Sequence, residues 1–126
     1  MSQPTAPGMP GSVGETATLI SVIDPLNYVI TLDAYTWEMH IVKNHPEMID
    51  FQDLIAPTAE KPQLIQSALS NGTCYYYRLT GRSFYKINDL YLSLVVARSE
   101  WTKTGAIQTA HLLKNIRKGG NTIWMR

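Results

Sequence analysis

The segment at residues 90–114, LYLSLVVARSEWTKTGAIQTAHLLK, gives the clearest indication of the fold. It contains two apolar runs, residues 90–98 and 106–114, which are separated by a short polar segment. Runs of this length and composition are typical of strands inside a sheet. The short connection between them predicts an antiparallel pair.

Side chains alternate between the two faces of a strand, so each run predicts which residues share a face. In the first run, one face carries Leu92, Leu94, Val96 and Arg98. In the second run, one face carries Ile107, Thr109, His111 and Leu113. If the aliphatic residues mark the face that helices cover, then Arg98, Thr109 and His111 point toward the core. Buried polar groups need partners, and a cleft would supply them.

The chain before this stretch predicts a hairpin followed by two short helices. Two β-branched runs, residues 19–23 and 28–32, flank the turn Asp24-Pro25-Leu26-Asn27. Asp33 is a good N-cap for a helix that begins at Ala34. One face of this helix should carry Trp37, His40, Ile41 and Asn44. Pro46 should end the helix at His45, and residues 50–55 predict a second helical segment that closes before Pro57.

The remaining segments predict further strands. Residues 61–65 should form an extended connector, and residues 74–79 and 84–87 should pair across the turn Thr80-Gly81-Arg82. A basic, glycine-rich loop at residues 117–120 precedes a short edge element that contains Trp124. The expected fold is α+β, with two short helices packed on a four-stranded antiparallel sheet and a β-hairpin before them.

Composition predicts a flexible tail at residues 1–16 and a single domain at residues 17–126. Cys74 is the one cysteine, so an intrachain disulfide is excluded. No apolar run approaches the roughly 20 residues of a membrane span, and the first residues lack the pattern of a secretion signal. We therefore expect a cytoplasmic protein without membrane contact.

Charge is divided unevenly along the chain. Residues 1–60 carry one base and eight acids, whereas residues 61–126 carry ten bases and two acids. A basic region of this kind favours a polyanion such as RNA, because its cations displace the counterions of phosphates. The candidate RNA-binding residues are Arg78, Arg82, Lys86, Lys103, Tyr77 and Trp124. The alternative is that the two halves attract each other within the fold.

Motifs for metal and nucleotide chemistry are missing from the sequence. His40 and His45 lie five residues apart, so they do not share the helix face that a zinc-binding HExxH motif requires. The chain contains neither a Walker loop nor a GxSxG elbow. We expect no metal and no cofactor, which leaves phosphodiester chemistry by side chains alone.

Several short motifs together resemble a known family. The segments are Trp37-Glu38-Met39-His40-Ile41, His45-Pro46-Glu47, Pro62-Gln63-Leu64-Ile65, Leu92–Arg98 and Ile107–His111. In this order they resemble phage-associated nucleases with the barnase/EndoU/colicin/RelE (BECR) fold. The resemblance covers residues 28–126 and implies RNA cleavage without a metal, with His40, Arg98 and Thr109 as functional residues. It departs from the family at His111, where a tyrosine is more usual.

The resemblance leads to a specific hypothesis, an endoribonuclease in which the 2′-hydroxyl of RNA attacks the adjacent phosphate. His40 would be the general base, His111 or a tyrosine the general acid, and Arg98 and Thr109 would bind the phosphate. Members of the family are often toxins or effectors of phages and mobile elements, which implies an acidic antitoxin or immunity protein as partner. Two alternatives remain, a non-catalytic RNA- or protein-binding module and a structural domain that self-associates.

Overall fold

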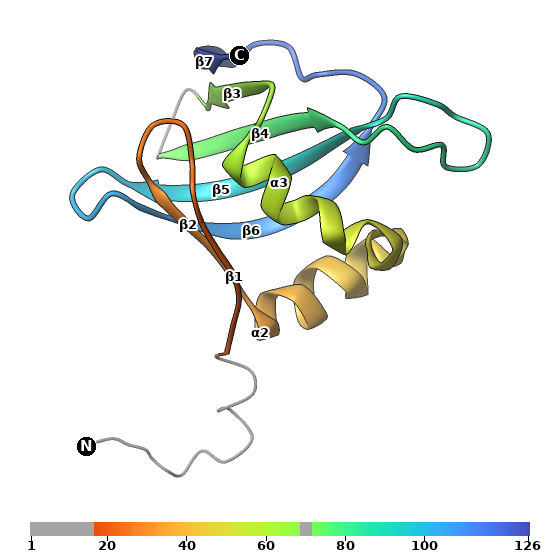
Figure 1. Cartoon of the computed structure of the whole chain (residues 1–126), viewed down its shortest axis with the longest axis horizontal. Coiled ribbons are helices and arrows are strands. Elements are labelled where there is room, and N and C mark those ends of the chain that lie inside the picture. Colours follow the sequence, from red (N-terminus) through yellow and green to blue (C-terminus); the bar gives the residue numbers. More distant parts are fainter. Residues whose placement is uncertain (1–16, 69–71) are drawn as a thin grey trace, which may run out of the picture.

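The computed structural model describes residues 17–68 and 72–126, so the predicted flexible tail at residues 1–16 lies outside the described residues. The strands are β1 (Thr18–Ile23), β2 (Val29–Asp33), β3 (Leu64–Ser67), β4 (Thr73–Leu79), β5 (Tyr91–Ser99), β6 (Thr104–Leu113) and β7 (Asn121–Met125). The helical segments between β2 and β3 are α2 (Ala34–Thr36), η1 (Trp37–Val42), η2 (Pro46–Leu54) and α3 (Ile55–Glu60). These segments lie together against one face of the sheet (Figure 1).

The α+β class is as predicted, but the predicted four-stranded antiparallel BECR-like sheet is wrong. The strands form one seven-stranded sheet in the order β1-β2-β6-β5-β4-β3-β7. The sheet is mixed because β2 pairs in parallel with the beginning of β6. At the other edge of the sheet, β7 pairs antiparallel with β3. Gly105 on β6 permits the close approach of β2, since a Cβ there would lie 2.7 Å from the Ile30 side chain.

The predicted hairpin and N-cap are confirmed. β1 and β2 pair antiparallel, and the buried carboxylate of Asp24 in their turn accepts hydrogen bonds from the backbone N–H groups of Leu26 and Tyr28. The hydroxyl of Tyr76 on β4 also donates to Asp24. Asp33 accepts a hydrogen bond of 2.7 Å from the N–H of Thr36, as expected of an N-cap.

The helical segments depart from the prediction in two ways. Trp37 and Ile41 are buried, but His40 is exposed, because η1 is a π-helix, whose wider turn places position i+4 rather than i+3 above position i. The second helix does not close before Pro57, since α3 continues to Glu60. Proline is tolerated there because its missing N–H falls in the first turn of α3.

Residues 84–87 do not form the predicted strand beside β4. They contain one isolated bridge, Phe84↔Ile87, and β4 pairs instead with β5. Positive φ angles at Gly81, Tyr85 and Lys86 turn this segment away from extended geometry. The result is a long loop at one end of the sheet, opposite the turn that connects β5 to β6 (Figure 1).

A β-bulge in β6 overturns the predicted faces. Val95 of β5 pairs with Thr109 but Val96 pairs with Ile107, so Gln108 is an extra residue. Ile107 therefore faces the helices, whereas Thr109 faces the opposite way.

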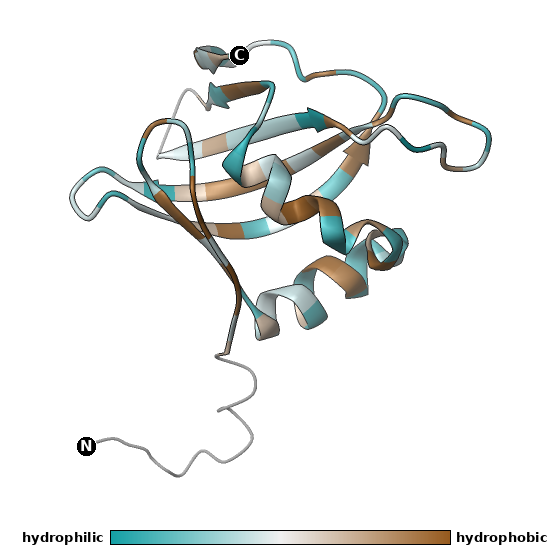
Figure 2. Ribbon diagram, viewed as in Figure 1, coloured by the Kyte–Doolittle hydropathy of each residue, from teal (hydrophilic) through white to brown (hydrophobic). Residues whose placement is uncertain are grey.

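The two faces of the sheet can be assigned from this pairing. The helix-side face carries Ile65, Tyr76, Leu92, Leu94, Val96, Arg98, Ile107 and Ala110. The far face carries Gln66, Tyr75, Tyr77, Ser93, Val95, Thr109 and His111. The main apolar core lies on the helix-side face, between the sheet and the helical segments. Figure 2 shows apolar residues along β1 and β2, in the middle of β5 and on parts of the helical segments.

Deletion of Gln108 should destabilise the protein by about 3 kcal/mol or more. Without the extra residue, the residues on one side of the bulge must change face, which exposes apolar core residues or buries polar ones. The substitution Gln108→Ala, which keeps the bulge, should change stability by less than about 0.5 kcal/mol because the side chain is exposed. Urea unfolding of both variants measures the difference, and equal stabilities would contradict this role of the bulge.

Candidate functional site

The catalytic residues predicted from the sequence do not converge. His40 is exposed on η1 and meets the ring of Tyr35 edge-on at 5.6 Å. Arg98 lies on the helix-side face, with its guanidinium 3.7 Å from the centre of the Tyr28 ring. Thr109 and His111 lie on the far face. The expectation that Arg98, Thr109 and His111 point to one side of the sheet is therefore wrong, and the bulge at Gln108 is the reason.

The predicted RNA-binding residues do not form one surface either. Tyr77 is fully buried, and Trp124 packs against the core. Arg78 donates a hydrogen bond of 2.7 Å to the carbonyl of Lys61. Lys86 lies in the loop after β4, whereas Lys103 lies at the opposite end of the sheet, 4.8 Å from the centre of the Tyr28 ring.

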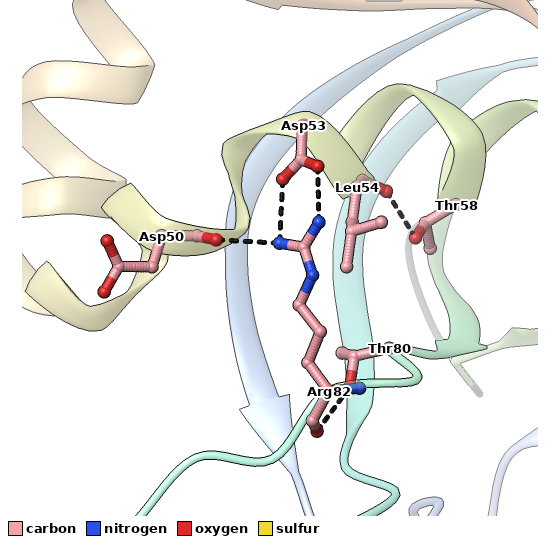
Figure 3. Close-up of polar contacts among 6 residues, drawn as sticks. All are labelled: Asp50, Asp53, Leu54, Thr58, Thr80 and Arg82. Carbon is pink, nitrogen blue, oxygen red and sulfur yellow. Dashed lines mark hydrogen bonds and ion pairs between the residues drawn. The ribbon is translucent and has the colours of Figure 1, made fainter.

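Arg82 joins the basic and acidic halves of the chain. Its guanidinium donates two hydrogen bonds to the carboxylate of Asp53, at 3.0 and 2.5 Å, and one to the carbonyl of Asp50 (Figure 3). The hydrogen bond from Arg82 lowers the pKa of Asp53. For this arginine, attraction between the two halves accounts for the charge better than RNA binding does.

A different set of polar side chains meets on the far face. The loop after β6 places the guanidinium of Arg117 over β4 and β5. Arg117 Nη1 lies 3.0 Å from Ser93 Oγ and 3.3 Å from Tyr77 Oη, and Nη2 lies 2.7 Å from Nε2 of His111. The guanidinium also stacks on the ring of Tyr75, at 4.5 Å.

A second histidine approaches the same place from the helices. β2 pairs with β6 only through residues 104–106, and η1 and η2 contact β6. His45, at the break between η1 and η2, stacks on His111 with ring centres 5.4 Å apart. Its Nδ1 lies 3.7 Å from a carboxylate oxygen of Glu47. We call His45, His111 and Arg117 the far-face cluster.

Within the far-face cluster, the guanidinium of Arg117 makes no ion pair with the described residues, and the carboxylate of Glu47 lies beside His45 instead. The ion pairs found among residues 17–68 and 72–126 join Arg82 to Asp53 and His45 to Glu47, and neither includes Arg117. A partly buried guanidinium that contacts only neutral groups attracts an anion, and its planar N–H groups match phosphate oxygens.

His111 is neutral at physiological pH. Burial lowers its pKa from 6.5 to about 4; Arg117 and His45 act in the same direction, and the carboxylate of Glu47 opposes them. Nε2 of a neutral imidazole can accept the hydrogen bond from Arg117, which places the proton on Nδ1. Nδ1 is buried and has no hydrogen-bond partner in the described part of the chain.

Sequence reasoning identified one member of the far-face cluster, His111, and missed the other two. Residue 117 belongs to the basic, glycine-rich loop, which is a signal for anion binding. His45 lies at the predicted end of a helix, where a histidine is no longer bound to the apolar face of that helix.

Comparison with known proteins does not add to this picture. No family model, curated protein or solved structure matches the chain. Among the described residues, no helix has the length and apolar character needed to span a membrane. No group of three or more histidine, cysteine, aspartate and glutamate side chains within residues 17–68 and 72–126 is arranged to hold a metal ion.

The lowered pKa of His111 predicts a loss of stability in acid. The unfolded chain binds a proton at His111 more readily than the folded protein does, so stability falls as the pH drops from about 6.5 to about 4. The variant His111→Gln keeps an acceptor for Arg117 but cannot titrate. Between pH 7 and pH 4, the unfolding free energy of the wild type should fall more than that of the variant, by on the order of 2 kcal/mol after allowance for partial exposure. Urea unfolding across this range measures the difference, and parallel curves would refute the assignment.

Proposed function

We propose that this protein is an endoribonuclease that cleaves RNA without a metal ion, by attack of the 2′-hydroxyl on the adjacent phosphate, and that the far-face cluster is its active site. One observation carries the proposal: the guanidinium of Arg117, which has no carboxylate partner, hydrogen-bonds one of two stacked imidazoles. This reaction requires a cation that stabilises the charge on the phosphate and imidazoles that transfer protons.

Arg117 would bind the phosphate. A guanidinium has five N–H donors, and three at most are used by Tyr77, Ser93 and His111. The remaining donors can hydrogen-bond phosphate oxygens. Because the two hydroxyls and the Tyr75 ring hold the guanidinium in place, little ordering is needed when negative charge develops on those oxygens.

His45 would accept the proton of the 2′-hydroxyl. Its side chain is about one-third exposed and so can reach a substrate, and the carboxylate of Glu47 lies where it stabilises the imidazolium that forms. The 2′-oxygen then bonds to phosphorus as the bond to the 5′-oxygen breaks.

His111 would protonate the leaving 5′-oxygen once substrate is bound. In the free protein its pKa of about 4 keeps it neutral. A bound phosphate brings negative charge next to the ring and draws the donors of Arg117 toward its own oxygens, and both effects raise the pKa of His111. A protonated His111 can then donate to the leaving group.

A second candidate function is RNA binding without cleavage. The observation that favours it is that Nε2 of His111 is engaged by Arg117 while Nδ1 is buried. In that case the far-face cluster would hold a phosphate, and proton transfer would not follow. The cleavage experiment below separates the two functions.

Cleavage of a mixed RNA in EDTA tests the enzymatic proposal, with His45→Gln and Arg117→Gln as the active-site variants. We expect rates lower by about 10²- to 10⁴-fold for His45→Gln, which removes a proton acceptor, and by about 10²- to 10³-fold for Arg117→Gln, which removes the phosphate-binding cation. Product separation on denaturing gels measures the rates.

The chain supplies matched controls for both variants. His40 is an exposed histidine on η1, the helical segment before His45. Arg82 is an arginine whose guanidinium is already paired with Asp53. His40→Gln and Arg82→Gln should both cleave at nearly the wild-type rate. Equal rates for His45→Gln and His40→Gln, or loss of wild-type activity in EDTA, would eliminate the proposed mechanism. RNA binding with steep salt dependence but no cleavage would establish the second function instead.

A further inference from the structure

A small hollow adjoins the far-face cluster, between β3, β4 and the loop that precedes β7. Its volume is about 230 Å³, which is below the roughly 300–1,000 Å³ of pockets for drug-sized ligands and suits a small planar group of one or two fused rings. The lining residues are Gln66, Ala68, Tyr75, Arg117, Lys118, Gly119 and Gly120. Since Arg117 belongs to both, the hollow and the proposed phosphate site are neighbours.

Gln66, which lines this hollow, has an unused hydrogen-bond acceptor. Its side-chain Nε2 donates a hydrogen bond of 3.3 Å to the carbonyl of Arg117, and this contact sets the orientation of the amide, because only the NH₂ group can donate. The other amide atom, Oε1, is buried and accepts no hydrogen bond from the described residues. Gln66 is only 7% exposed, and a buried carbonyl of this kind calls for a donor.

Gly120 keeps the space beside this acceptor open. A Cβ at position 120 would lie 3.2 Å from both Oε1 and Cβ of Gln66, closer than almost all side-chain contacts. The backbone of Gly120 does not have a positive φ, so the lack of a side chain matters here for space rather than for conformation. Gln66 and Gly120 together thus form one wall of the hollow.

We propose that this hollow binds a nucleobase that carries an exocyclic amino group, as cytosine and adenine do, next to the phosphate held by Arg117. The inference rests on the proposed function and specifies its substrate. An amino group donates to Oε1 of Gln66, whereas the corresponding atom of uracil is a carbonyl oxygen, which would face Oε1 with no hydrogen between them. Arg117 links the two subsites, because its backbone carbonyl orients Gln66 while its side chain binds phosphate.

The experiment compares binding of two labelled hexanucleotides, oligo(C) and oligo(U), by fluorescence anisotropy in low salt and EDTA. Both carry 2′-O-methyl groups, which remove the nucleophile and prevent cleavage. The wild type should bind oligo(C) about 3- to 10-fold more tightly than oligo(U), which is the effect of one buried hydrogen bond made or left unmade. In Gln66→Leu the two affinities should agree within about twofold.

A second variant tests the same prediction independently, in case Gln66→Leu does not fold. Gly120→Ala places a methyl group beside Oε1 and should also abolish the preference for oligo(C). The exposed Thr122, close by on β7, serves as control, and Thr122→Ala should keep the wild-type preference. Thermal unfolding of each variant shows that it is folded.

The outcomes distinguish this inference from the proposed function. Equal binding of oligo(C) and oligo(U) by the wild type, or a preference that survives in both variants, overturns the base subsite while cleavage by the far-face cluster stands. Failure of the wild type to bind either oligonucleotide overturns the subsite and counts against RNA as the substrate.

Discussion

The extra residue in β6, Gln108, sets which side chains of this strand face the core and which face the far side of the sheet. Before it, Ile107 packs into the core on the helix-side face, and beyond it Ala110 does the same while His111 faces the other way. A strand without the bulge would direct His111 and the core residue Ile107 to the same face. The bulge lets one strand contribute apolar groups to the core and a histidine to the far-face cluster, and bulges often serve to re-aim side chains in this way.

The far-face cluster also depends on the parallel pairing of β2 with β6. Because this pairing stops at Ala106, the second half of β6 is accessible to η1 and η2, and His45 can stack on His111. Arg117 then connects the histidine to groups on β4 and β5. Burial and the charge of Arg117 both lower the pKa of His111, so an anion bound at Arg117 would raise that pKa.

The charge asymmetry along the chain suggests more unpaired basic side chains than the fold contains. Arg82 is paired with Asp53 of the acidic half, and Arg98 stacks on Tyr28 on the helix-side face. Arg117 differs from Arg82 because it contacts neutral groups. A count of charges along the sequence cannot separate a paired cation from an unpaired one, since the partners lie 29 residues apart for Arg82 and are set by the fold.

Several local features could be predicted from the sequence, because each follows from propensities and hydrogen bonds within a few residues: the β1–β2 hairpin, the Asp33 cap, the break at Pro46 and the strands β5 and β6. Three other features appear only in the three-dimensional structure: the π-helical turn that exposes His40, the parallel pairing of β2 with β6, and the bulge at Gln108. These features arise from packing and strand pairing between distant segments, and a shift of one residue reverses every side chain beyond it. The sequence therefore predicted the kinds of group in the candidate site, imidazole and guanidinium. It could not predict which histidines and arginines meet, because that depends on one-residue shifts of this kind.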